Sequence, residues 1–374
     1  MKIGIVCYPT YGGSGVVATE LGMALAGMGH KVHFITYNLP FRLNLMAANI
    51  SYHEVAVRDY PLFDYPPYEL LLTSKLVDVA RFEGLDLLHV HYAIPHASAA
   101  FHAQRILESI GICLPFITTL HGTDITLVGK DISFKPVTEF SINSSDKVTT
   151  VSESLKRDTL SYFDIKKEID VIPNFICIEK YGNKNGDGIR DSVASADEKV
   201  LVHISNFRKV KRVEDVVYTF SKVRAKIPAK LILVGDGPER HNIEVLCRDL
   251  GVCKDILFMG KIKAPEYVLA AADLYLVTSE TESFGLSVLE AMASAVPVIS
   301  TNKGGLPEVN KHGFSGYLHE VGDTDAMAKS AIKILSDDAL LQKFRNNALK
   351  QAGQFDIKRV LPKYLDLYQS LLGE

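Results

Sequence analysis

The residues with the clearest chemical potential are two glutamates, Glu282 and Glu290, which bracket a glycine turn that opens into a predicted helix. Phe284, Gly285 and Leu286 form the turn between them. Free backbone N–H groups at a helix start can hold phosphate or sugar oxygens, and the two carboxylates can accept hydrogen bonds from hydroxyl groups. The alternative is a pair of solvated surface glutamates, since such a spacing also arises by chance.

A second candidate is a basic stretch, Ser205–Arg212, which directly follows a predicted strand. Its cations are Arg208, Lys209, Lys211 and Arg212, and they suit a diphosphate, whose charge must be stabilised as it leaves. The alternative is a solvated, charged helix start. Because cations at a helix N-terminus oppose the helix dipole, a bound anion explains them better.

In the first half of the chain, Gly12–Gly15 follows the first predicted strand and precedes a helix. These glycines let a ligand approach the backbone closely, but they do not form the dinucleotide-binding pattern, and a tight turn without function explains them equally well. His121 and Asp124 follow the strand Phe116–Leu120, where they are well placed for polar contact with a substrate. A lone histidine is more often structural, but the neighbouring Gly-Thr-Asp favours function here.

No metal site is predicted. His89, His91 and His96 are interpreted as structural because their spacing does not match a metal centre. Asp323 and Asp325 resemble a carboxylate pair but stand in a late turn beside a helix, so we expect an N-cap there.

The elements that must position these residues follow the alternation of parallel βαβ units, which predicts an α/β fold. The predicted strands are 2–7, 31–37, 85–90, 116–120 and 147–151 in the first half, and 200–205, 230–235, 256–260, 274–278 and 296–301 in the second. We therefore predict two domains, 1–172 and 173–355, with a glycine-rich surface loop at 181–188. A terminal amphipathic helix over about 356–374 is predicted to pack on one of the domains, the first being the candidate.

Composition excludes several classes of protein. With 374 residues and 47% apolar content the chain can bury sizeable cores, and a net charge of −3 gives no global attraction to nucleic acid or anionic membranes. Five scattered cysteines without a CxxC pair argue against disulfides and zinc. No apolar run is long enough for a membrane span, and no signal peptide is evident, so a soluble cytoplasmic protein is predicted. A homo-oligomer is left open.

Taken in order, several segments resemble the retaining glycosyltransferases of family 4: Gly12–Gly15, His121–Asp124, Lys211, Glu282 with Glu290, and Gly304–Glu308. The resemblance runs from the first strand to about Gly316. It implies the GT-B fold, in which two Rossmann-like, doubly wound domains face each other across a cleft. It also implies transfer of a sugar from a nucleotide diphosphate without a metal ion.

Finer segments resemble one subfamily, which acts first in bacillithiol biosynthesis: 7–9, 40–44, 65–68, 89–96, 118–126 and 205–212. That likeness implies UDP-N-acetylglucosamine as donor and L-malate as acceptor. Alternatives are a family 4 enzyme with another donor or acceptor, a nucleotide-sugar 2-epimerase, and an inactive sugar-nucleotide binding protein.

The resemblance also implies roles for individual residues. His121, Lys211 and Glu282 are the implied catalytic residues. The implied donor site comprises Gly13, Ser14, Gly15, Asn206, Arg208, Lys211, Phe284, Gly285, Leu286 and Glu290. Asn206 stands where many relatives carry arginine, which leaves open whether Arg208 or Arg212 assists Lys211. For the acceptor, the candidates at predicted strand ends and loops are Ser14, Arg42, Asn44, Tyr92, Thr119 and Thr123, and each could equally be structural.

Overall fold

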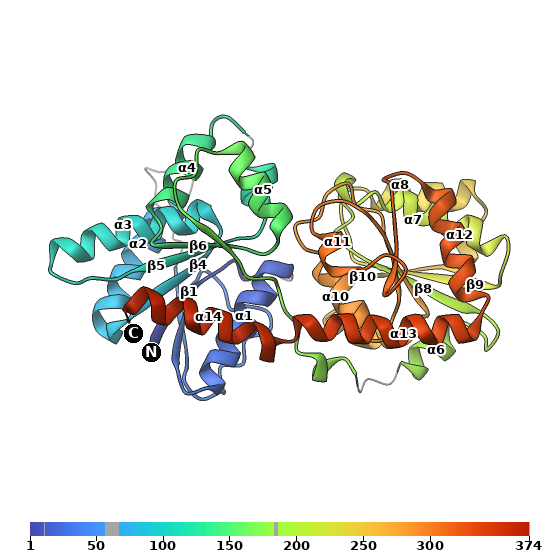
Figure 1. The fold of residues 1–374 in the computed structure, drawn as a ribbon, viewed down its shortest axis with the longest axis horizontal. Helices are drawn as coiled ribbons and strands as arrows, with labels where there is room; N and C mark the ends of the chain where they lie inside the picture. Colours follow the sequence, from blue (N-terminus) through green and yellow to red (C-terminus); the bar gives the residue numbers. More distant parts are fainter. Residues whose placement is uncertain (11, 57–66, 130, 183–185, 374) are drawn as a thin grey trace. The chain divides into compact units, whose positions relative to one another are not determined.

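The structure is a computed structural model that describes residues 1–10, 12–56, 67–129, 131–182 and 186–373. The chain divides into two compact units (Figure 1). Unit 1 comprises Met1–Asn174 together with Ile357–Glu374, and unit 2 comprises Phe175–Asp356. Among the helices of the described residues, none is long and apolar enough to cross a membrane.

Unit 1 is built on a parallel sheet with the strand order β3-β2-β1-β4-β5-β6-β7. Its central strands are short, almost wholly buried runs, as expected where helices cover both faces of a sheet (Figure 1). The strands are β1 Lys2–Val6, β2 Lys31–Thr36, β3 Ile50–Glu54, β4 Leu87–His91, β5 Phe116–Leu120, β6 Lys147–Thr150 and β7 Ile169–Val171. The helices are α1 Gly13–Gly27, α2 Tyr68–Val79, α3 Ser98–Ser109, α4 Lys135–Ser144, α5 Glu153–Tyr162 and α14 Ile357–Leu372, with short turns η1 Ala80–Gly84, η2 Ala93–Ala97 and η3 Thr123–Leu127.

Unit 2 repeats this architecture with the strand order β10-β9-β8-β11-β12-β13, again all parallel. The strands are β8 Lys199–Ile204, β9 Ala229–Val234, β10 Ile256–Gly260, β11 Leu274–Val277, β12 Val298–Thr301 and β13 Gly316–His319. The helices are α6 Asp187–Val193, α7 Val213–Arg224, α8 Arg240–Asp249, α9 Pro265–Ala270, α10 Leu286–Ala293, α11 Leu306–Val309, α12 Thr324–Leu335 and α13 Asp338–Ala352, with turns η4 Ile178–Lys180, η5 Lys209–Lys211, η6 Cys253–Asp255 and η7 Gly353–Phe355. The predicted pair of doubly wound sheets is confirmed.

The terminal helix α14 belongs to unit 1, where it packs beside α1 (Figure 1). Its apolar stripe buries Val360, Tyr364 and Tyr368. The Tyr368 hydroxyl is hydrogen-bonded to Nδ1 of His89 at 2.7 Å, which ties the last helix to the central strand β4. His89 is therefore structural.

Three strands escaped prediction: β3, β7 and β13. The β3 sequence is largely polar and only half-buried because the strand lies at the sheet edge, so it lacks the apolar signal of a central strand. The predicted N-cap at Asp323 is confirmed, since its carboxylate accepts a hydrogen bond from the Ala326 N–H at 3.0 Å.

The prediction of a surface loop at 181–188 is wrong at both ends, while residues 183–185 lie outside the described residues. Tyr181 is buried, and α6 begins at Asp187. Gly186 packs against the chain at Ala271: a Cβ there would lie 2.4 Å from the Ala271 nitrogen. Glycine at 186 therefore serves close packing of two segments.

Candidate functional site

Several candidate residues follow the strands at which the strand order of each sheet reverses. The strand order reverses between β1 and β4 in unit 1, and between β8 and β11 in unit 2. Ligands of doubly wound sheets bind beyond the carboxyl ends of the strands at such a switch point. Gly12–Gly15 follows β1 and Tyr92 follows β4, while Lys211 and Glu282 follow β8 and β11.

In unit 2, the glutamate loop is shaped by two glycines from a distant segment. A Cβ on Gly304 would lie 2.0 Å from the Glu282 carbonyl oxygen, and one on Gly305 would lie 2.5 Å from that of Ser283. The Gly305 N–H donates to the Glu282 carbonyl at 2.8 Å. The Gly304–Glu308 segment thus acts as a backbone support for the loop, because only glycine lets the two chains approach this closely.

The same loop leads into α10 through Gly285, which has a φ of 96° and so favours glycine. Phe284 is buried and packs edge-on against Phe355. Leu286 begins the helix, whose first N–H groups have no intrahelical partner and can bind an anion or a sugar oxygen.

Lys211 and Glu282 meet across the switch point of unit 2. Lys211 Nζ lies 2.5 Å from Glu282 Oε2, and each side chain is about a fifth exposed, at 20% and 22% respectively. The Lys211 ammonium group and the Glu282 carboxylate, which can accept hydrogen bonds from hydroxyl groups, are therefore held together in a largely buried position. The structure brings these two predicted residues into direct contact.

Glu290 is buried on α10, about one turn from the helix start at Leu286. Its Oε1 accepts a hydrogen bond from the Tyr181 hydroxyl at 2.8 Å. Tyr181 was not predicted, and no sequence signal marks it, since the two residues lie 109 positions apart. The tyrosine fixes one oxygen of this carboxylate.

The cations of the basic stretch differ in whether they pair with carboxylates of the same unit. Arg212 donates to Asp215 at 2.6 Å and to Glu280 at 3.1 Å, and those hydrogen bonds raise its pKa. Arg208 and Asn206 are exposed. Among the described residues no salt bridge of Arg208 is found, in contrast to Arg212. The cations do not stand at a helix N-terminus as we expected, because Lys211 lies in the turn η5 and the first turn of α7 carries Glu214 and Asp215. Opposition to the helix dipole therefore gives less reason to expect a bound anion here.

In unit 1, the loop Gly12–Gly15 enters α1 by a tight turn. Gly12 is the N-cap and Gly13, Ser14 and Gly15 form the first turn of the helix. Gly15 is needed for packing, because a Cβ there would lie 2.6 Å from the Tyr8 carbonyl oxygen and 2.7 Å from that of Thr10. The N–H groups of this first turn point away from the helix without intrahelical partners.

Three predicted acceptor residues come together around the hydroxyl of Tyr92. The hydroxyl donates to Ser14 Oγ at 2.7 Å, and the Thr123 side chain lies near enough to the Tyr92 hydroxyl to affect its pKa. Burial raises the Tyr92 pKa to about 12, so the phenol keeps its proton at neutral pH. Tyr92 has a φ of 85°, a strained conformation for a bulky residue, which places its side chain off the end of β4.

His121 lies beside this group, with its ring 5.2 Å from that of Tyr92. Its Nε2 is hydrogen-bonded to Nδ1 of His91 at 2.8 Å, and burial lowers the His121 pKa to about 3. Asp124 braces the turn by accepting N–H bonds from Gly122 and Ala93 at 3.0 and 2.9 Å. His121 is therefore a neutral hydrogen-bonding group at pH 7. His91, which we interpreted as purely structural, orients it.

The other acceptor candidates lie elsewhere. Thr119 is wholly buried, and its hydroxyl is hydrogen-bonded to His89 and Thr149, both at 2.7 Å. Its hydroxyl is thus used within the interior of unit 1, and its contact with the acceptor stays a prediction. Arg42 lies 3.7 Å from Glu20, and Asn44 accepts the Met46 N–H within its own turn at 3.0 Å.

Comparison with known proteins places this site in context. The family described as Glycosyltransferase Family 4 matches residues 11–180, and Glycosyl transferases group 1 matches residues 187–351. The chain is 48% identical over 376 residues to the N-acetyl-alpha-D-glucosaminyl L-malate synthase of Bacillus anthracis, covering 100% of this chain and 98% of that protein.

Solved structures agree with this in fold. HepE of Anabaena in complex with UDP and glucose superposes with a TM-score of 0.83 at 20% identity, covering 99% of this chain and 100% of that one. Sucrose-phosphate synthase of Thermosynechococcus elongatus gives a TM-score of 0.81 at 21% identity, covering 100% and 99%. At these identities the likeness establishes the fold alone, and the predicted fold class is confirmed.

Proposed function

This chain belongs to glycosyltransferase family 4, and on that premise we propose that it transfers N-acetylglucosamine from UDP-N-acetylglucosamine to the hydroxyl of L-malate, the first step of bacillithiol biosynthesis. The observation that carries the proposal is the 48% identity, over the whole chain, to a protein named for that reaction. The five cysteines are free thiols, which agrees with a cytoplasmic location.

The donor would bind to unit 2. The N–H groups at the start of α10, near Gly285 and Leu286, are suited to phosphate or sugar oxygens, and the carboxylate of Glu290 to the ribose hydroxyls. Lys211 would neutralise the diphosphate with help from Arg208, while Glu282 holds a hydroxyl of the transferred sugar. These side-chain cations take the place that a metal ion has in other transferases, so we propose that the transfer itself needs no metal.

The acceptor would bind to unit 1. A dicarboxylate needs hydrogen-bond donors, and Ser14, Tyr92 and Thr123 supply hydroxyl groups at the end of β4 and the start of α1. The first-turn N–H groups of α1 add a positive helix terminus nearby. Arg42 and Asn44 stay weaker candidates, since the salt bridge of Arg42 to Glu20 and the hydrogen bond of Asn44 to the Met46 N–H already engage their side chains.

The proposed chemistry retains configuration at the sugar. The malate hydroxyl oxygen forms a bond to the anomeric carbon on the face from which UDP departs, and the departing phosphate takes the hydroxyl proton. No side chain then acts as a strong base, which agrees with a neutral His121 that contacts the sugar as a hydrogen-bonding group. Catalysis rests on positioning and on stabilising the leaving group.

We expect Glu290→Ala to raise the KM for the donor roughly 10–100-fold, because hydrogen bonds to a charged group contribute about 1.5–3 kcal/mol. Tyr181→Phe is the matched variant: it keeps the carboxylate but removes the hydroxyl that orients it. In steady-state kinetics with the donor concentration varied, Tyr181→Phe should also raise the donor KM, but by a smaller factor than Glu290→Ala. An unchanged donor KM in Glu290→Ala would remove the ribose role.

Tyr92→Phe should raise the KM for malate about tenfold and leave the donor KM nearly unchanged, since the variant loses one hydroxyl and the order that it gives Ser14 and Thr123. Tyr218→Phe, exposed on α7, is the control. A larger change in donor KM than in malate KM would place Tyr92 in the donor site instead.

The substrate assignment itself is tested with a panel. UDP release is measured with UDP-N-acetylglucosamine or UDP-glucose as donor, each combined with L-malate, D-malate, succinate or no acceptor. We expect the highest kcat/KM for UDP-N-acetylglucosamine with L-malate and none with succinate, which lacks the hydroxyl. Isomerised sugar without any acceptor would favour an epimerase, and a higher rate with another pair would replace the substrates while leaving the family intact.

A further inference from the structure

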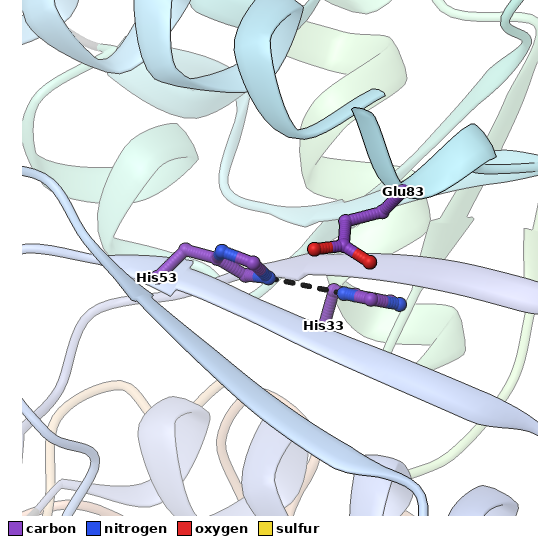
Figure 2. Close-up of side chains that lie close together, drawn as sticks. All are labelled: His33, His53 and Glu83. Atoms are coloured by element: carbon purple, nitrogen blue, oxygen red, sulfur yellow. Dashed lines mark hydrogen bonds between the residues drawn. The ribbon is translucent and has the colours of Figure 1, made fainter. Parts of the chain in front are cut away.

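Two histidines and a glutamate lie together in unit 1 on residues that the proposed transfer does not use (Figure 2). His33 belongs to β2, His53 to the edge strand β3, and Glu83 to the turn η1 that follows α2. His33 Nδ1 lies 3.0 Å from His53 Nε2, and one ligand atom from each of the three residues lies within 4.8 Å of the others.

The strand register places the two imidazoles on one face of the sheet. His33 pairs with Ser51 and Ile35 pairs with His53, so the histidines occupy diagonal positions on neighbouring parallel strands. Ile35 packs in the core that contains Leu72 and Leu76 of α2. The imidazoles therefore face the α2 side, and Figure 2 shows the Glu83 carboxylate reaching toward them from η1.

We propose that His33, His53 and Glu83 bind one divalent transition-metal ion, with Zn²⁺ the best match. Two imidazole nitrogens and one carboxylate oxygen are a ligand set that zinc accepts, with a fourth position left for water. Two Zn–N bonds of about 2.0–2.1 Å at a tetrahedral angle set their nitrogens roughly 3.3 Å apart. The observed separation of 3.0 Å is close to that value.

The electrostatics of the cluster bear on its affinity. Burial lowers the pKa of both histidines, so both rings are neutral at pH 7 and their lone pairs can bind a metal. Lys2, Lys31 and Lys75 face the cluster from β1, β2 and α2 and oppose a cation, while Glu83 and Asp78 favour one. We therefore expect weaker binding than at a fully enclosed structural zinc site.

A bound ion would join the paired strands β2 and β3 to the turn η1. The edge strand β3 pairs with β2 alone, and η1 contributes its carboxylate from the end of α2. A metal bridging β2, β3 and η1 would hold this edge of the sheet in place. Its role is thus stabilisation of unit 1, independent of the proposed sugar transfer, and its failure would leave that transfer proposal intact.

The test measures Zn²⁺ binding to the full chain by isothermal titration calorimetry, with bound metal counted after dialysis. Because the exposed thiols of Cys113 and Cys253 also attract zinc, both are replaced by serine in every sample. We expect one equivalent of zinc and a higher thermal midpoint when zinc is present. Glu83→Gln, at an exposed position that tolerates change, should lower the affinity at least tenfold, and His53→Gln should do the same.

His102→Gln is the matched control, since it removes an exposed imidazole from α3 of the same unit. It should bind zinc as tightly as the parent protein. Two results would overturn the proposal: no zinc retained by the parent protein, or zinc bound equally tightly by Glu83→Gln and His53→Gln.

Discussion

Lys211→Ala is expected to lower kcat roughly 10²–10³-fold, the usual effect of removing one preorganised donor to developing negative charge. The KM for the donor should change less, because the lysine acts most strongly once the bond to the diphosphate is breaking. The physical basis is the position of Nζ, held 2.5 Å from Glu282 in a partly buried pair. There its charge is screened less than in open water.

Removing the lysine also leaves the Glu282 carboxylate without this partner, so the single variant mixes two effects. The single variant Glu282→Gln and the double variant Lys211→Ala with Glu282→Gln separate them: if loss of the cation is the cause, removing the lysine lowers kcat by a similar factor in both backgrounds. Lys329→Ala, exposed on α12, controls for surface charge. A kcat within a few-fold of the unaltered protein in Lys211→Ala would contradict the role of this lysine as the leaving-group cation.

The second large effect is a loss of stability of unit 1 at acidic pH. Unit 1 buries four histidines whose pKa values burial holds far below 6.5: His89 and His121 at about 3, His96 at about 4, and His91 lower than its ordinary value. In the unfolded chain each takes up a proton near pH 6.5. The stability that these neutral rings contribute is therefore present above pH 6.5 and is lost as the pH falls toward 4.

Asp124 acts in the opposite direction. Burial raises its pKa to about 6, so the folded protein holds this proton after the unfolded chain has released it, and stability is lost as the pH rises from about 4 to 6. Counted over these five groups, four histidines against one aspartate give a net uptake of three protons on unfolding. Each proton corresponds to about 1.4 kcal/mol per pH unit, so these groups alone should lower the free energy of unfolding by about 4 kcal/mol per pH unit near pH 5. His33 and His53, whose pKa values burial also lowers, act in the same direction.

Urea unfolding at pH 7.5, 6.5, 5.5 and 4.5 measures this dependence, with a probe in each unit. Unit 2 should respond less, because His203, with its pKa lowered by burial to about 4, is the comparable buried histidine in its described part. His121→Asn should remove about one proton from the uptake of unit 1 on unfolding and so make its free energy of unfolding depend less steeply on pH. His102→Gln, at an exposed position, should leave that dependence unchanged. A free energy of unfolding that stays constant between pH 7.5 and 5 would contradict the burial of neutral imidazoles.

The fold class and most strands were predictable because central parallel strands are apolar runs followed by glycine turns. The same signal marked candidate site residues, because Lys211, Glu282 and Gly15 each follow such an apolar run. What sequence could not supply were partners distant along the chain. Tyr181 reaches Glu290 across 109 residues, and this pairing depends on how the start of unit 2 folds back on α10.

Thr119 shows a different limit. Residues alternate between the two faces of a strand, but the sequence does not say what covers each face. The Thr119 hydroxyl bonds His89, which in turn meets Tyr368 of α14, so this side chain serves the interior. The glycines at 304 and 305 show the converse: the family resemblance marked them, and the structure gives the reason, which is the close approach of the Glu282 loop.

The most direct test of the proposed function is the mass of the product formed from UDP-N-acetylglucosamine and L-malate in the presence of EDTA. UDP release that requires malate, together with a product of the mass of N-acetylglucosaminyl-malate, is the predicted result. It would establish donor, acceptor and a transfer without metal in one reaction. UDP release that is independent of malate, or no product of that mass from active protein, would contradict the assignment.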